Sequence, residues 1–250
     1  MGNKMRHIVV IGATSAIAQA CMAIWVKQEL TQFTLIARNA DHLARITQDL
    51  SIKNPDTNID CHHLDFLDPE AIHSFADRAS TLPIDIALIA HGYLPEQEDC
   101  ETDLTLCKKT IEINALSPAL FAEALAQVME KQRSGKLAVI GSVAGDRGRK
   151  SNYVYGASKA FIASYLSGLT HRFANTSIKV TLIKPGPVET PMTLRYKAKG
   201  LAMASPEEVA KDIVTAIEKG KAVIYTPGKW HLVMLIIQHL PNFIFNKLNI

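Results

Sequence analysis

Short runs of apolar residues alternate with segments of helical pattern along the chain, and this alternation restricts the fold more than any other feature. A strand buried on both faces gives a near-continuous apolar run, and parallel strands need a long crossover connection, usually a helix. The pattern therefore predicts an α/β fold built on a doubly wound parallel sheet flanked by helices. We expect its strands at residues 7–11, 33–37, 58–64, 83–90, 137–140, 178–183 and 222–225.

The composition is that of one globular domain with a sizeable core. The chain has 250 residues, of which 48% are hydrophobic and 20% charged, and no linker-like segment interrupts it, so we expect a single domain over residues 1–250. A net charge of +3 argues against nucleic-acid binding. The four cysteines lack metal-ligand spacing, so we expect no metal site and free buried thiols. The first residues contain no signal-peptide pattern, which predicts a cytoplasmic protein.

The stretch from Gly141 to Lys159 carries the residues with the clearest chemistry. Ser142 follows a buried strand, and Tyr155 and Lys159 are four residues apart, which places them on one face of a helix. The lysine charge favours the phenolate and so lowers the tyrosine pKa from about 10. Tyr155 can then exchange a proton with a substrate oxygen that Ser142 orients, as carbonyl reduction requires. The alternative is an amphipathic helix with a buried tyrosine and a solvated lysine; the serine and the nucleotide-site signals favour chemistry.

The first strand runs into a glycine-containing turn, Gly12-Ala13-Thr14-Ser15-Ala16-Ile17-Ala18, and then a helix. Backbone N–H groups and the helix dipole at such a turn favour a pyrophosphate. A dinucleotide loop usually carries three glycines, and alanines occupy the second and third places here, so the Cβ of Ala16 should crowd the phosphates slightly. We expect the cofactor to contact Gly12, Thr14, Ser15, Ala16 and Ile17.

Two further strand ends carry candidate adenosine contacts. Arg38 follows the second strand, where an acidic residue would bind a free ribose hydroxyl and an arginine suits the 2′-phosphate of NADP. A surface arginine is the alternative. Asp65-Phe66 follows the third strand, and Asp65 can accept a hydrogen bond from the adenine amino group or cap the turn before Pro69.

The fourth strand ends in Ala90-His91-Gly92, and Gly92 would let the backbone approach a cofactor ribose. His91 is either a titrating group near the site or a hydrogen-bonded strand-end histidine. Asn114 lies in a helical stretch predicted over residues 102–131. It is either a solvent-facing or kink residue or the holder of a water next to Lys159.

The sixth strand ends in Pro185-Gly186, a turn at the edge where open α/β sheets bind ligands. Val188 and Thr190 can contact the nicotinamide amide and the phosphates. Residues 186–205 have weak periodicity and are interpreted as a mobile substrate lid. Ser205-Pro206 then provides a cap and first turn for the next helix.

Residues 228–246 form a strongly apolar tail. The run is too short and contains too many polar residues for a transmembrane span, which needs about 20 apolar residues. Three interpretations stay open: a helix completing the core or a dimer interface, a cover for a lipid-like substrate, or an interfacial membrane helix over residues 230–245. Trp230 and Lys247 near its ends suit the third.

Taken together, the residues resemble the short-chain dehydrogenase/reductase family over essentially the whole chain. The resemblance implies a Rossmann-type sheet of seven strands in the order 3-2-1-4-5-6-7 and a catalytic tetrad. In that tetrad the tyrosine is the general acid or base, the lysine binds the nicotinamide ribose, the serine orients the carbonyl and the asparagine holds a proton-relay water. The Asn-Asn-Ala-Gly that the family usually carries after the fourth strand is replaced here by Ile89-Ala90-His91-Gly92, which alters a ribose contact. The matching residues are Gly12, Ala16, Ala18, Asp65, Ala90, His91, Gly92, Asn114, Ser142, Tyr155, Lys159, Pro185 and Gly186.

The resemblance implies an NADPH-dependent reductase of a ketone or keto sugar, with NAD(H) less favoured, working as a homodimer or homotetramer. The turn at residues 12–18 and the apolar tail also make the chain similar to the decaprenylphosphoryl-2-keto-pentose reductase subgroup, which implies a lipid-linked substrate and contact with the inner face of the membrane. Two other functions compete: an NADP-binding sensor or scaffold without chemistry, and a sugar-nucleotide epimerase, for whose larger C-terminal domain the chain leaves little room.

Overall fold

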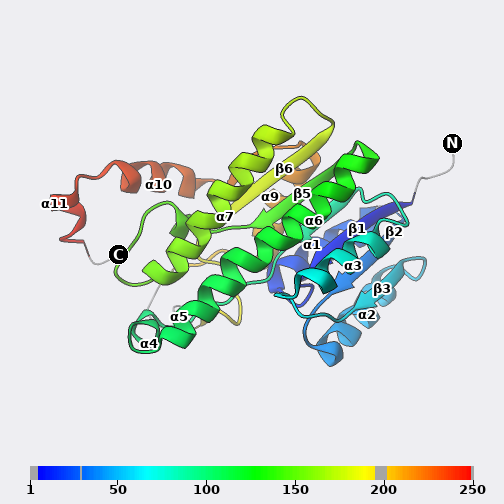
Figure 1. Ribbon diagram of the computed structural model, residues 1–250, viewed down its shortest axis with the longest axis horizontal. Helices are drawn as coiled ribbons and strands as arrows, with labels where there is room; N and C mark the ends of the chain where they lie inside the picture. Colours follow the sequence, from blue (N-terminus) through cyan, green and yellow to red (C-terminus); the bar gives the residue numbers. More distant parts are fainter. Residues whose placement is uncertain (1–4, 29, 195–201, 249–250) are drawn as a thin grey trace.

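The computed structural model describes residues 5–28, 30–194 and 202–248 (Figure 1). Its centre is a seven-stranded sheet in the order β3-β2-β1-β4-β5-β6-β7, in which every neighbouring pair is parallel. The predicted α/β class and sheet order are therefore confirmed. The strands are β1 (Arg6–Ile11), β2 (Thr31–Ile36), β3 (Asn58–His62), β4 (Ile86–Ile89), β5 (Gly135–Ile140), β6 (Ile178–Pro185) and β7 (Val223–Thr226).

Helices cover both faces of the sheet and make two cores. One core packs against α1 (Ala16–Gln28), α2 (Ala40–Lys53) and α9 (Pro206–Glu218). The other packs against α3 (Pro69–Ala79), α6 (Ser117–Gln132) and α7 (Tyr153–Arg172), which lie in front of the sheet in Figure 1. Helix α9 begins at the predicted signal, since the Ser205 side chain accepts from the Glu208 N–H.

The single helix predicted over residues 102–131 is wrong. Thr102 ends α4 (Gln97–Thr102), and Asp103 caps the separate helix α5 (Leu104–Ile111) by accepting from two backbone N–H groups. A π-helical turn, η1 (Glu112–Leu116), then joins α5 to α6. The irregular turn coincides with a long-range contact, in which the Asn114 side chain bonds the main chain at Tyr93.

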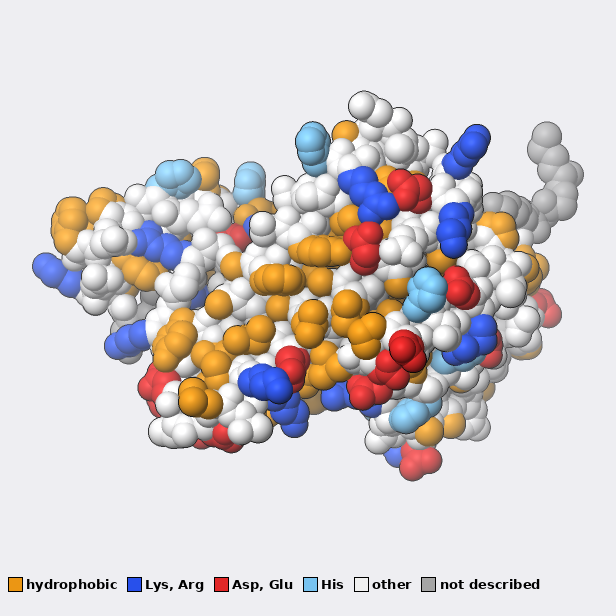
Figure 2. Space-filling view, viewed as in Figure 1, with side chains coloured by type: hydrophobic (Ala, Val, Ile, Leu, Met, Phe, Trp, Pro, Cys, Tyr) orange, Lys and Arg blue, Asp and Glu red, His pale blue; other side chains and the backbone are white. Residues whose placement is uncertain are grey.

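The structure of the tail bears on one of its three interpretations, a helix that completes the core. It forms two short helices, α10 (Lys229–His239) and α11 (Asn242–Phe245), which are separated at Pro241, where the missing N–H prevents a continuous helix. Met234 is the only buried residue of these two helices, so a tail that completes the core is wrong. Orange side chains on the tail and on the face of α5 to α7 mark apolar surface in Figure 2. No helix among the described residues is long and apolar enough to cross a membrane.

The cysteines are free, as expected, but not all of them are buried. Cys21 and Cys100 are buried, whereas Cys61 is exposed because it lies on β3, the edge strand of the sheet. Within the described residues no cluster of metal-ligating side chains occurs.

Candidate active site

A cavity of about 1050 Å³ opens at the carboxyl ends of the strands. This is the edge at which open α/β sheets bind ligands. The structure brings almost every predicted site residue into its wall, from the turn after β1 to the segment after β6. These residues are Gly12, Thr14, Ser15, Ala16, Ile17, Arg38, Phe66, Ala90, His91, Gly92, Ser142, Tyr155, Lys159, Pro185, Gly186, Val188 and Thr190.

The turn after β1 is built by its backbone. Gly12 has a φ of 82°, and a Cβ on it would lie 2.7 Å from the backbone nitrogen of His91. The N–H groups of Gly12 and Ala13 both donate to the Ile36 carbonyl, which ties the turn to β2. Helix α1 begins directly after this turn and has no acidic residue in its first turn, so its positive end faces the cavity without a competing carboxylate.

Of the two predicted adenosine contacts Arg38 and Asp65, only Arg38 lines the cavity. Arg38 is exposed at the cavity rim, and its guanidinium forms no ion pair within the described part of the chain. Asp65 is exposed, does not line the cavity, and accepts a hydrogen bond from the Leu67 N–H at 2.9 Å. The helix cap before Pro69 is Asp68, so among the described residues Asp65 makes only this turn contact, and its contact with adenine stays a prediction.

Lys159 is buried inside the site. Its Nζ donates to the Ile140 carbonyl at 3.0 Å and lies 5.8 Å from the centre of the Tyr155 ring. Burial lowers the pKa of Lys159 to about 8. Ser142 stands at the end of β5, where its Oγ accepts from the Ala144 N–H at 3.0 Å. Both hydroxyl-bearing residues, Ser142 and Tyr155, line the same cavity as this ammonium.

Asn114 is buried behind the cavity wall and is held by three hydrogen bonds. Its Nδ2 donates to the carbonyls of Tyr93 and Thr110, and its Oδ1 accepts from the Tyr93 N–H. A Cβ placed on Gly92 would lie 3.1 Å from Asn114 Oδ1 and 3.8 Å from Lys159 Nζ. Asn114 therefore braces the chain beside Lys159, and its side chain is largely occupied by that bracing.

The His91 side chain packs into the interior beside the site. Its Nε2 lies 2.9 Å from Ser117 Oγ, and its ring packs edge-on against Phe66 and Phe121. Burial, together with the charges of Lys159 and Arg38, lowers the pKa of His91 to about 3. The hydrogen bond expected of a strand-end histidine is present at Nε2, whereas Nδ1 is buried without a partner among the described residues.

Sequence reasoning missed the residues that hold the loop before α7. The Asp146 carboxylate pairs with Lys184 Nζ and accepts from the Tyr225 hydroxyl, and its side chain is only 2% exposed. The next residue, Arg147, donates to the carbonyls of Ile237 and Leu240 at 2.5 and 2.6 Å. These contacts join segments that are far apart in the sequence, so no local sequence pattern predicts them.

The far wall of the cavity comes from the tail. Trp230, Val233 and Ile237 of α10 line it, beside the segment that follows β6. The Trp230 indole lies against Gly186, where a Cβ would come within 2.0 Å of Nε1. Residues 195–201 of the predicted lid lie outside the described residues, and an isolated bridge joins Val188 to Ala204. The lid's mobility stays a prediction.

Comparisons with known proteins identify the family. The short chain dehydrogenase family model matches residues 6–200. An uncharacterised oxidoreductase of Mycobacterium tuberculosis is 30% identical over 219 residues, covering 86% of each chain. Another uncharacterised oxidoreductase, of Streptomyces coelicolor, is 28% identical over 247 residues, covering 97% of this chain and 96% of the relative.

Solved structures share the fold. Levodione reductase superimposes with a TM-score of 0.82 at 18% identity, covering 89% of this chain and 96% of its own. A short-chain dehydrogenase from Sphingobium yanoikuyae in complex with NADPH gives 0.81 at 17% identity, covering 95% and 97%. With the sheet order, the cavity and the family match all in agreement, this chain belongs to the short-chain dehydrogenase/reductase family of NAD(P)-dependent oxidoreductases.

Proposed function

We propose that this chain is an NADPH-dependent reductase of a ketone or keto sugar. One observation carries the proposal: Ser142, Tyr155 and Lys159 line the same cavity as the Gly12 turn and Arg38. The residues present also fit a dinucleotide. The acid-free N-terminus of α1 suits a pyrophosphate, and Arg38, unpaired among the described residues, suits a phosphate on the ribose.

Each side chain has a defined task in the reduction. NADPH, when bound, supplies the hydride. Ser142 donates a hydrogen bond to the substrate carbonyl oxygen and so orients it. Tyr155 gives its phenolic proton to that oxygen as the alkoxide develops, and the Lys159 ammonium stabilises the resulting phenolate. Asn114 keeps the backbone beside Lys159 in place, and a water held there would return the proton to Tyr155.

The mechanism is tested by Tyr155→Phe, which removes the proton donor and little else. We expect kcat/KM for carbonyl reduction to fall by roughly 10² to 10⁴, while NADPH binding, followed by fluorescence titration, persists. The matched control is Tyr153→Phe, a tyrosine two residues earlier on α7 that is exposed and outside the cavity wall. Full turnover in Tyr155→Phe would refute the proposed acid. NADPH binding by the wild type without turnover of any carbonyl would favour the sensor alternative.

The cofactor preference is tested separately at Arg38. A charge-assisted hydrogen bond to the 2′-phosphate is worth about 1.5–3 kcal/mol, so Arg38→Asp should reduce the preference for NADPH over NADH by tenfold or more. Arg45→Asp, an exposed arginine of α2 outside the cavity wall, is the control for net charge. An unchanged preference in Arg38→Asp would remove the phosphate role from this residue.

A lipid-linked keto sugar is a second candidate substrate, favoured by the apolar wall that Trp230, Val233 and Ile237 give the cavity. Such a wall suits the isoprenoid hydrocarbon chain that a phosphate joins to the keto sugar. NADPH consumption measured with polyprenyl-phosphate keto sugars and with soluble ketones distinguishes the two. Turnover with soluble ketones alone would exclude the lipid-linked class.

We also propose a homo-oligomer that forms through the face of α5 to α7. Exposed apolar side chains gather there, among them Leu104, Leu116 and Phe161, and this face is marked by orange in Figure 2. Phe161→Glu should shift the species in sedimentation velocity toward the monomer. A wild-type chain that sediments as a monomer would contradict the proposal.

A further inference from the structure

Helix α10 has apolar side chains on two opposite stripes. The inner stripe, Trp230, Val233, Met234 and Ile237, follows the spacing of one helix face and points to the cavity or the core. The outer stripe contains Leu232 and Ile236, one turn apart and 63% and 57% exposed. Contiguous exposed apolar surface commonly marks an interaction site. The described residues leave the outer stripe uncovered.

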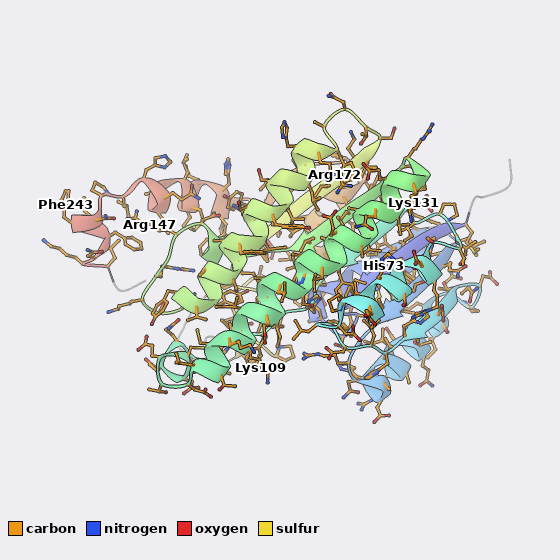
Figure 3. All side chains as sticks on the ribbon, viewed as in Figure 1. His73, Lys109, Lys131, Arg147, Arg172 and Phe243 are labelled. Atoms are coloured by element: carbon orange, nitrogen blue, oxygen red, sulfur yellow. The ribbon has the colours of Figure 1, made fainter. Side chains whose placement is uncertain are left out.

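The apolar surface continues onto α11. Phe243, labelled at the outer end of the tail in Figure 3, is 70% exposed, and Ile244 beside it is also exposed. The tail itself carries charge of one sign, since no acidic residue follows Glu218 in the sequence. Its basic residues are Lys229 and Lys247, whereas Lys219 and Lys221 precede β7 at the opposite edge of the sheet. Apolar side chains combined with lysines and no carboxylate are complementary to an anionic interface.

The carbonyl groups at the end of α10 have hydrogen-bond partners, which they would need in an apolar environment. The last carbonyls of a helix have no partner within the helix, and in lipid each one left bare costs several kcal/mol. Arg147 donates to the carbonyls of Ile237, Gln238 and Leu240, and its other nitrogen donates to the Asn242 side chain. Its guanidinium also lies 3.8 Å from the Phe245 ring centre. Figure 3 shows Arg147 where the loop before α7 meets the tail.

We propose that α10 and α11 form a docking surface for a lipid bilayer with anionic headgroups. The outer stripe enters the interface, the lysines contact the headgroups, and Arg147 closes the carbonyls at the helix end. A second copy of the chain is a poorer cover, because a twofold contact would oppose like patches that hold lysines and no carboxylate. Docking places the cavity wall one helix thickness, about 10 Å, from the membrane. The proposal stands on the tail alone and does not depend on the reductase activity.

Vesicle sedimentation of the full chain, without cofactor or substrate, tests the surface. We expect at least tenfold stronger partitioning to vesicles of mixed phosphatidylglycerol and phosphatidylcholine than to phosphatidylcholine alone, with the difference lost at high salt. The paired change Leu232→Asn and Ile236→Asn should weaken the partitioning about tenfold or more, since each removes apolar area that the interface would bury. The matched control is Ile52→Asn, an isoleucine of α2 that is 74% exposed.

Three results would overturn the proposal. The first is a wild-type chain that stays in the supernatant with both vesicle types. The second is an equal loss of partitioning in Ile52→Asn and in the paired variant. The third is a paired variant that changes the sedimentation coefficient in lipid-free solution while vesicle binding is unaffected, because the outer stripe would then contact another copy. Far-ultraviolet circular dichroism and the melting temperature confirm that each variant is folded, so that a loss of partitioning is assigned to the surface.

Discussion

The two halves of the cavity are built from different materials. The half at residues 12–17 and 90–92 is formed by main chain at strand ends and by the start of a helix. The main chain at Gly12 lies so close to that of His91 that a Cβ on Gly12 would come within 2.7 Å of it. The half at residues 186–193 and 230–237 is walled by side chains, several of them from the tail. A surface made of backbone resists change, whereas a surface made of side chains is altered by single substitutions. The first suits a shared cofactor and the second a particular substrate.

The largest effect is expected from a glycine substitution in the backbone half. Gly12→Ala combines a positive φ with a contact of 2.7 Å to the His91 backbone, which cannot turn away. We expect a loss of about 2–4 kcal/mol in unfolding free energy and of at least a hundredfold in NADPH affinity. Urea unfolding and fluorescence titration measure the two. If both the unfolding free energy and the NADPH affinity of Gly12→Ala stayed near the wild-type values, the backbone half would not be more rigid than the side-chain half.

The same substitution in the other half should have a smaller and correctable effect. Gly186→Ala meets the Trp230 indole, a side chain of the tail that can move. We expect KM for the substrate to rise about tenfold, following an overpacking cost of roughly 1–3 kcal/mol. Adding Trp230→Leu should restore most of the loss, because the indole then no longer opposes the new methyl group. A double variant as impaired as Gly186→Ala alone would show that Gly186 acts through the cofactor instead.

The buried histidine of the backbone half gives a pH effect of intermediate size. The unfolded chain protonates this residue below about pH 6.5, whereas burial lowers the pKa of His91 in the folded state to about 3. Between these values the unfolded state binds more protons, so stability falls as the pH falls, by up to about 1.4 kcal/mol per pH unit. Chemical unfolding at pH 4 to 7, wild type against His91→Asn, measures it. Parallel stability curves for the two proteins would mean that His91 is not held neutral by burial.

The smallest effect is expected from Gly168→Ala, a glycine substitution outside the cavity that serves as the reference for the substitutions in the two halves. Gly168 lies on the exposed face of α7, and a Cβ there would meet nothing within 4 Å. Gly168→Ala should raise the unfolding free energy by about 0.5–1 kcal/mol, since alanine is the better helix former, without changing KM or cofactor affinity. A destabilised variant would show that a partner subunit packs against Gly168 itself, beyond the contact near Phe161 that the proposed oligomer requires.

Local signals predicted the sheet well, and long-range contacts account for the rest. Each strand is an apolar run, and the Ser205 cap is visible in four consecutive residues. The π-helical turn at residues 112–116 is set by the bonds of Asn114 to Tyr93, which no helical periodicity encodes. Most of the site residues were found because their spacing resembles a family. The sequence left the place of the tail open among three interpretations, because an apolar helix has the same pattern whether it is buried, lines a cavity or is exposed.

Arg147 has a consequence for how such a protein can diverge. Three of its partners in the tail, at Ile237, Gln238 and Leu240, are main-chain carbonyls, which every amino acid supplies. The attachment of the tail is therefore nearly indifferent to which side chains the tail carries. Descendants of one ancestral gene could exchange residues along α10, acquire a new substrate wall, and still keep that wall anchored to the loop between Ser142 and Tyr155. The residues proposed for the chemistry can then stay the same while the side chains of α10 that shape the substrate wall change.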